Sequence, residues 1–353
     1  MRDNVKYQDV YEKLRKIATE TNTSRKLPSL KQLCDTYQVS LVTMNSALDL
    51  LEEDGLIRRE ARRGIFLTPQ EPQQRSGRIS LLMPGVQEPF FTVIIDTLRR
   101  YLTTFGLKTV VTLYDFNENS EAEELRRLRD YNRIDGILYL PTFGSLRLRD
   151  LLIELAASKP VVQFDRVWAE GVTPFVGYEE FQTCYDAANH LISHGHRDIG
   201  LILANTDLLD NPSERLKGFL AALQDAGLSL NPKNVITYYY FDPDLSSNVV
   251  ELLSSPQCPT AFFAVNNVYL SRFLRKAAFA GKRVPGDISF ICVSTDESME
   301  QFSADFTYFR QPTRTVVVEA AKLLLRRLKG ETLPPTELRF PSVLVEGNSC
   351  RPR

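Results

Sequence analysis

The apolar positions at the start of the chain recur with the spacing of an α-helix. Those near one face of the first stretch are Val5, Val10, Leu14 and Ile17. Because apolar residues three or four positions apart line one side of a helix, this pattern predicts a helix over residues 5–18. Ser29 and Gln32, three positions apart, form a capping box, which predicts a second helix from residue 30 to about residue 37.

A third helix is predicted over residues 41–54. Ser40 before it is a favoured N-cap residue, and Gly55 after it suits the left-handed end of a helix. The apolar positions at helical spacing, which are expected to face a core, are Met44, Ala47, Leu48 and Leu51. The positions left facing outward are Leu41, Val42, Thr43, Asn45, Ser46 and Asp49.

Two short β-like segments follow at residues 56–59 and 65–68, joined by the sequence EARRG. A helix, a helix–turn–helix and a β-hairpin in this order predict an N-terminal winged helix-turn-helix over residues 1–68. The arginines expected at the hairpin tip, where a wing reaches phosphates or the minor groove, are Arg58, Arg59, Arg62 and Arg63. A solvated charged face, or a winged helix that contacts proteins, is the alternative interpretation.

The third helix of a winged helix enters the major groove of DNA. Exposed Leu41 and Val42 suit thymine methyl groups there, and Asn45 suits adenine. Ser40 and the N-terminus of the helix suit a phosphate. The overall charge is little evidence for DNA binding, because the formal net charge is −1 and residues 1–75 carry 13 Lys and Arg against 11 Asp and Glu.

The segment LPSLKQLCDTYQVSLVTMNSALDLLEEDGLIRREARRGIFLT resembles the GntR-type winged-helix domain, and the resemblance covers residues 5–68. Leu41 and Asn45 stand where that family often has arginines, so the operator is expected to differ from the family's commonest one. By the resemblance, DNA-contacting positions are Ser29, Thr43, Asn45 and Gly64. The full set of expected DNA-binding residues is Ser29, Lys31, Ser40, Leu41, Val42, Thr43, Asn45, Ser46, Arg58, Arg62, Arg63 and Gly64.

After an aperiodic segment rich in proline and glutamine, residues 69–77, the pattern changes. That segment is typical of a domain linker. From residue 78 onward, short apolar segments such as RISLLMP and KTVVTLY alternate with amphipathic helices, which predicts a doubly wound parallel α/β sheet. The rhythm repeats, so residues 78–353 are expected to form two lobes. Lobe 1 is expected at about 78–163 and 297–328, and lobe 2 at about 166–294 and 329–348.

Eight segments in order resemble the sensor domain of the lactose-repressor family, which is similar to ribose-type periplasmic binding proteins. They are QEPFF, RIDGILYLP, PVVQFDR, AANHLISHGHRDIGLI, SERLKGFLAAL, PTAFFAVNNVYL, RVPGDISFICV and TYFRQP. A GntR-type domain joined to such a sensor resembles the arabinose-repressor subgroup. The resemblance implies a periplasmic-binding-protein-like domain that binds a small effector between its lobes, and a homodimer on a palindromic operator.

Ligands of open α/β sheets bind outside the carboxyl ends of the strands, where several polar and aromatic residues fall. By resemblance, aromatic residues would pack on a sugar ring, and charged or amide groups would bind its hydroxyls. The expected effector-binding residues are Glu88, Phe90, Phe91, Asp165, Arg166, Arg215, Asn266, Ser294 and Gln311. Core packing of the two phenylalanines, a local Asp165–Arg166 salt bridge and a surface position for Arg215 are the alternatives. Trp168 is a further residue that could reach the cleft or lie at its rim.

Two departures from the family concern this site. Glu88 stands where the family has a binding asparagine, and Ser294 stands where it has a hydroxyl-binding aspartate. Asp296 follows one or two positions late. We hypothesise that Glu88 partly replaces the carboxylate lost at Ser294.

The sequence thus predicts a DNA-binding transcriptional repressor under allosteric control by a sugar-like effector. A purine- or nucleotide-sensing regulator of the same fold is the alternative, and a fused enzyme of the pyridoxal-phosphate type is disfavoured, since no nucleophile elbow and no P-loop occur. No catalytic residue, cofactor or metal site is expected. The chain has no run of 18 apolar residues and its start lacks an apolar signal core, so a cytoplasmic protein without membrane contact is expected.

Overall fold

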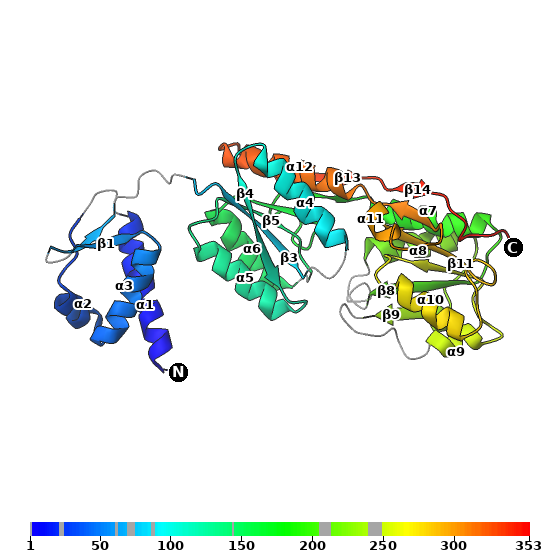
Figure 1. Cartoon of the computed structure of the whole chain (residues 1–353), viewed down its shortest axis with the longest axis horizontal. Helices are drawn as coiled ribbons and strands as arrows, with labels where there is room; N and C mark the ends of the chain where they lie inside the picture. The colour runs from blue at the N-terminus through cyan, green and yellow to red at the C-terminus, as the bar shows by residue number, and fades with distance from the viewer. Residues whose placement is uncertain are drawn as a thin grey trace. The chain divides into compact units, whose positions relative to one another are not determined.

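The computed structural model describes residues 2–20, 25–60, 63–68, 75–85, 89–142, 145–204, 213–238 and 249–353. The chain divides into two compact units, Met1–Ser76 and Gly77–Arg353 (Figure 1). Arg62, Glu88 and most of the expected linker lie outside the described residues.

The first unit is a winged helix, in agreement with the sequence pattern. Its elements are α1 (Arg2–Glu20), α2 (Leu30–Tyr37), α3 (Leu41–Glu53), β1 (Ile57–Glu60) and β2 (Gly64–Leu67). The capping box at Ser29 is present, Ser40 caps α3, and Gly55 follows α3 with a positive φ of 70°. The predicted core residues of α3 are all fully buried, namely Met44, Ala47, Leu48 and Leu51.

The second unit contains two six-stranded sheets with helices on both faces (Figure 1). The first sheet has the order β13 (Glu337–Phe340), β7 (Phe175–Tyr178), β6 (Val161–Asp165), β5 (Gly136–Tyr139), β3 (Arg78–Pro84), β4 (Lys108–Tyr114). The second has the order β14 (Val343–Val345), β12 (Thr307–Arg310), β11 (Ser289–Ser294), β10 (Ala261–Ala264), β8 (Ile199–Ala204), β9 (Val235–Tyr238). The predicted parallel sheets are confirmed, except that β14 runs antiparallel to β12.

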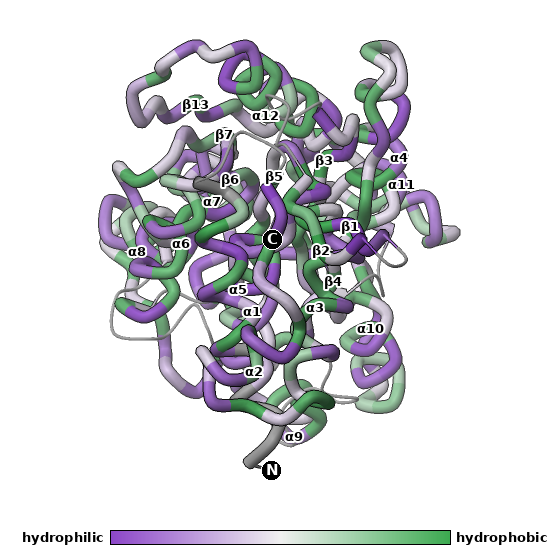
Figure 2. Tube along the Cα trace, turned by 90° about the vertical axis from the view of Figure 1, so that its left-hand side faces the viewer, coloured by the Kyte–Doolittle hydropathy of each residue, from purple (hydrophilic) through white to green (hydrophobic). Residues whose placement is uncertain are grey.

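Helices cover both faces of each sheet because their apolar stripes pack onto the strands. On the first sheet, α4 (Pro89–Thr103) and α12 (Thr313–Leu328) pack on one face, and α5 (Glu118–Asp130) and α6 (Leu146–Ser158) on the other. On the second, α7 (Glu180–Ser193) and α8 (Glu214–Asp225) lie opposite α9 (Val249–Ser254) and α10 (Leu270–Phe279). Along α6, α8 and α10, hydrophobic and hydrophilic residues alternate in Figure 2, as amphipathic helices require.

The strand order corrects the expected lobe bounds at all three crossings. β7 pairs with β6, so the first lobe extends to Tyr178 and the first crossing precedes α7. β12 pairs with β11, so the second crossing comes after Arg310, and α12 returns to the first sheet. β13 pairs with β7, so the third crossing lies between β13 and β14. The helical and strand periodicity carries no information on which of two equivalent sheets a strand joins, which explains the difference.

The helix α11 (Asp296–Met299) follows β11 directly, and the sequence pattern did not indicate it. Within the described residues, no helix combines the length and the apolar composition that crossing a bilayer requires.

Candidate functional site

The start of α3 presents the side chains expected to meet DNA. Leu41 is 55% exposed and Val42 is 76% exposed, although both are apolar. The Ser40 hydroxyl accepts a hydrogen bond from the Thr43 amide at 3.2 Å and lies 2.8 Å from the Thr43 hydroxyl. The cap therefore holds the two hydroxyl groups together at the positive end of the helix dipole, where an anion is stabilised.

Further along α3, the outward residues are tied to the helix or to the wing. The Ser46 hydroxyl donates to the Val42 carbonyl at 3.1 Å. Arg59 donates to the Asn45 carbonyl at 3.4 Å and pairs with Asp49 at 2.7 Å. The predicted position of Arg59 at the hairpin tip is therefore wrong, since its side chain turns back onto α3.

Two of the other wing arginines pair with one acidic residue of β1. Arg58 and Arg63 both pair with Glu60, at 3.3 and 2.6 Å, and both remain largely exposed. Gly64 begins β2 with a φ of 113°, a conformation that favours glycine. Lys31 on α2 is exposed.

The second unit has a cleft at the carboxyl ends of strands from both lobes, with about 510 Å³ of space that is partly open to solvent. Its lining residues are Phe90, Phe91, Asp165, Arg166, Arg215, Asn266, Asn267, Val268, Val293, Ser294, Thr295, Ser298 and Gln311. The structure thus brings together every expected effector-binding residue that it describes, and Glu88 alone lies outside the described residues. Sequence reasoning had not named Thr295 or Ser298, which follow β11.

Arg215 is held rigidly at the back of the cleft. It is only 8% exposed, and its Nε and Nη2 both donate to Glu180 Oε1, at 2.9 and 2.6 Å. Its Nη1 donates to the Val265 carbonyl at 2.9 Å. Sequence analysis missed Glu180, although its place two residues after β7, at the carboxyl end of a strand, was an available signal.

Asp165 ends β6 with a positive φ of 67°, which is uncommon for a residue with a side chain. Burial raises the pKa of this carboxyl to about 6, although the charges of Arg166 and Arg215 oppose the rise. Arg166 Nε lies 3.5 Å from Asp165 Oδ2. The expected alternative of a local salt bridge and the predicted place in the cleft therefore both hold, since Asp165 and Arg166 also line the cleft.

The aromatic wall of the cleft comes from the first turn of α4. The rings of Phe90 and Phe91 meet edge to face, with centroids 5.3 Å apart. Phe91 is also buried in the core of the first lobe, against which Phe90 packs. The two rings are thus fixed by core packing while they face the cleft.

The opposite wall is polar and carries no carboxylate at position 294. The Ser294 hydroxyl donates to the Thr295 carbonyl at 3.2 Å, and the Ser294 carbonyl accepts from the Gln311 amide at 2.8 Å. Asp296 is instead bound to the Tyr308 hydroxyl and to Arg310, the latter at 3.1 Å. Asp296 is therefore committed to the second lobe and does not line the cleft.

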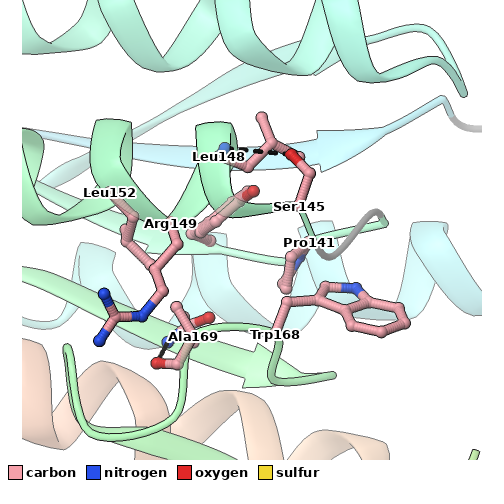
Figure 3. Close-up of a pocket in the computed structure, with 9 residues that line it drawn as sticks. Pro141, Ser145, Leu148, Arg149, Leu152, Trp168 and Ala169 are labelled. Carbon is pink, nitrogen blue, oxygen red and sulfur yellow. Dashed lines mark hydrogen bonds between the residues drawn. The ribbon is translucent and has the colours of Figure 1, made fainter. Parts of the chain in front are cut away.

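Trp168 lies in a separate, smaller pocket of the first lobe and not in the main cleft. Figure 3 shows it on one side of that pocket, with Arg149 on the other and Ser145 at the start of α6. Buried Gln163 also lines this pocket and donates to the Ala169 carbonyl at 3.2 Å. Within the described part of the chain, no group of His, Cys, Asp and Glu is placed to hold a metal ion.

Comparisons with known proteins agree with the two-part architecture. The sequence pattern of the family described as bacterial regulatory proteins, gntR family, matches residues 6–67. The pattern described as periplasmic binding protein-like domain matches residues 188–350.

Three related proteins extend over most of the chain. The HTH-type transcriptional repressor PurR of Aliivibrio fischeri is 30% identical over 72% of this chain and 75% of its own length. The arabinose metabolism transcriptional repressor of Halalkalibacterium halodurans is 26% identical over 87% of this chain and 84% of its own. A crystal structure of a LacI family transcriptional regulator from Enterococcus faecium with bound ribose has a TM-score of 0.63 and 26% identity, covering 78% of this chain and 99% of its own.

These relatives are transcriptional repressors or regulators, the class of protein that the sequence predicted. One domain of the present chain matches a DNA-binding family, and the other matches a ligand-binding fold. The chain therefore belongs to the LacI-type family of transcriptional regulators, in which a gntR-family DNA-binding domain is here joined to a periplasmic-binding-protein-like sensor domain.

Proposed function

We propose that this regulator is a repressor whose operator binding is controlled by a small sugar-like effector in the cleft of the second unit. The observation that carries the proposal is the convergence of residues from distant segments on one cleft. They come from α4, the end of β6, α8 and the ends of β10, β11 and β12. The relative from Enterococcus faecium was solved with ribose, which supports an effector of this class.

The chemistry of the cleft suits a polyol with one apolar face. Phe90 and Phe91 offer aromatic surface to the C–H groups of a sugar ring. Arg166, Arg215 and Asn266 carry donors for hydroxyl oxygens, while Asp165 accepts from hydroxyl groups when ionised. The remaining expected contacts are Ser294 and Gln311.

In this proposal, Glu88 partly replaces the carboxylate that is missing at position 294. Glu88→Gln is then expected to weaken effector binding by more than about twofold, because a charge-assisted hydrogen bond becomes a neutral one. Titration calorimetry measures the change, and an affinity within twofold of the unmodified protein would remove Glu88 from the site.

Effector binding would act on DNA through the lobes. Three crossings join the lobes. An effector that contacts both lobes favours the closed arrangement, in which the lobes lie together around it, over an open one. In a homodimer, lobe rotation changes the separation of the two winged helices and hence their fit to the half-sites of a palindromic operator. The repressor would act in the cytoplasm, with operator DNA, the effector and a second copy as its partners and no membrane contact.

Exposed apolar side chains support the homodimer. Val111 and Leu113 are exposed on β4, the edge strand of the first sheet, and Phe279 is exposed at the end of α10. Large exposed apolar groups on an edge strand are common at subunit interfaces. Cross-linking on DNA that produced only monomer would contradict this part of the proposal.

Isothermal titration against pentoses, hexoses, deoxy-sugars, disaccharides and purines tests the effector class. Saturable heat from one sugar, absent in Arg215→Ala and retained in the surface control Arg275→Ala, is the expected result. Binding of a purine would favour the alternative, a nucleotide-sensing regulator in which Phe90 and Phe91 stack on a base. No heat from any compound would contradict the sugar proposal and direct attention to phosphorylated ligands.

A further inference from the structure

A third extended segment, residues 25–27, runs beside β2 and adds to the two-stranded wing hairpin of β1 and β2. The Leu27 amide donates to the Ile65 carbonyl at 2.8 Å, and the Leu67 amide donates to the Arg25 carbonyl at 2.8 Å. Lys26 forms an antiparallel bridge with Phe66. This third segment was not predicted from the sequence pattern, and it adds a basic residue to the wing.

The two faces of this small sheet differ in chemistry. Phe66 lies opposite Arg58 on one side and Lys26 on the other, and residues opposite one another in antiparallel strands share a face. Side chains alternate along a strand, so the neighbouring residues Leu27 and Leu67 face the other way, and both are buried in the core. The row of Lys26, Phe66 and Arg58 therefore covers the outer face.

Three cations surround the Phe66 ring on that face. Lys26 Nζ, Arg58 Cζ and Arg63 Cζ each lie 5.8 Å from the ring centroid. A cation at this distance is attracted by the negative face of an aromatic ring, which limits the directions that a long side chain samples. Glu60 pairs with both arginines, so the cluster has three positive groups against one carboxylate.

Lys26 also lies beside a position that the GntR-type resemblance assigns to DNA contact. A Cβ atom built on Gly64 would stand 2.8 Å from Lys26 Cε and 3.5 Å from its Nζ. The lysine ammonium is thus carried to the start of β2, next to the hairpin tip. An alanine at Gly64 would displace the lysine side chain.

We propose that Lys26, Arg58 and Arg63 form one phosphate-binding surface, the basic platform, with Phe66 as the residue that positions them. Lys26 is a DNA-binding residue in addition to those named from the sequence. The basic platform contacts the sugar–phosphate backbone and contributes affinity that does not depend on base sequence. The side chains of α3 then read the bases.

The test measures binding of the full chain to a fluorescein-labelled duplex of mixed sequence by anisotropy across a series of KCl concentrations. The slope of log K against log[KCl] is negative, and the loss of one phosphate contact makes it less steep by about 0.9. Lys26→Gln is expected to show this smaller slope, and Lys26→Arg to keep the original one. Phe66→Leu is expected to weaken binding by about two- to fivefold with less change in slope, because the charges remain.

Lys13→Gln is the matched control, since Lys13 is an exposed lysine on α1 that pairs with Asp9 at 2.6 Å. Its slope should equal that of the unmodified protein. An unchanged slope in Lys26→Gln would overturn the proposal. An equal fall in Lys13→Gln would also overturn it, because net charge alone would then account for the effect. Thermal melting confirms that each variant is folded.

Discussion

The two units of this regulator place their functional side chains in opposite environments. In the winged helix, the described residues expected to meet DNA are exposed or half-buried, as with Val42 at 76% exposure, and they lie close together in sequence. In the two-lobed unit, the candidate ligand-binding groups include buried Asp165 and Arg215, which lie far apart along the chain. An exposed site can change with little effect on folding, whereas a buried polar site is coupled to stability.

Arg215→Ala tests this contrast most severely. Removing the guanidinium takes away the hydrogen-bond donors of the Glu180 carboxylate and the Val265 carbonyl, so the free energy of unfolding should fall by about 3 kcal/mol. Effector affinity should fall by about a hundredfold or more. Chemical denaturation and calorimetry measure the two effects. Full stability in this variant would contradict the contrast between the units.

Asp165 should make the stability of the two-lobed unit depend on pH. Its folded pKa of about 6 lies above the ordinary value of 3.8, so the folded state holds the proton more tightly than the unfolded state. The stabilisation is fully present below the ordinary value and is lost as the pH rises through 6, by up to about 3 kcal/mol. Asp165→Asn should therefore gain stability relative to the unmodified protein between pH 4 and pH 7, as measured by urea unfolding at each pH. If the free energies of unfolding of the two proteins differed by the same amount at every pH, the shifted pKa of Asp165 would be contradicted.

Glu180→Gln sharpens the comparison within the cleft, because Glu180 acts through Arg215 and does not line the main cleft. Loss of the charged acceptor should weaken effector binding by about tenfold. The neighbouring exposed residue provides the control, and Glu179→Gln should bind normally. If Glu180→Asp restored no affinity and only the melting temperature moved, Glu180 would have a structural role alone.

Glu60→Gln should give the smallest effect of these variants, and it should strengthen binding, here to DNA, where Arg215→Ala and Glu180→Gln weaken binding of the effector. Glu60 neutralises part of the charge of Arg58 and Arg63 at the protein surface. Its removal should raise affinity for mixed-sequence DNA by about two- to threefold, since exposed ion pairs are weak. Anisotropy at low salt measures this change, with little change in unfolding expected. Weaker DNA binding would mean that Glu60 orients the two arginines.

How far the sequence predicted each part depends on how local the determining interactions are. The caps at Ser29 and Ser40 and the stop at Gly55 operate within one turn of helix, so their residue types were sufficient. The third wing segment at Lys26 depends on pairing with β2, about forty positions away, and no local pattern indicated it. Arg59 was misplaced for the same reason, because its partners are on α3.

The sequence by itself determined the two-unit organisation, the order of helices and strands, and the residues that follow strand ends, because amphipathic periodicity and capping are local. Only the tertiary structure decided which sheet receives β7, β12 and β13, and with them the three crossings between lobes. It also decided that Glu180 holds Arg215 and that Asp296 turns away to Tyr308. Those outcomes depend on contacts between segments distant in sequence, where several partners of equal local suitability compete and packing selects one.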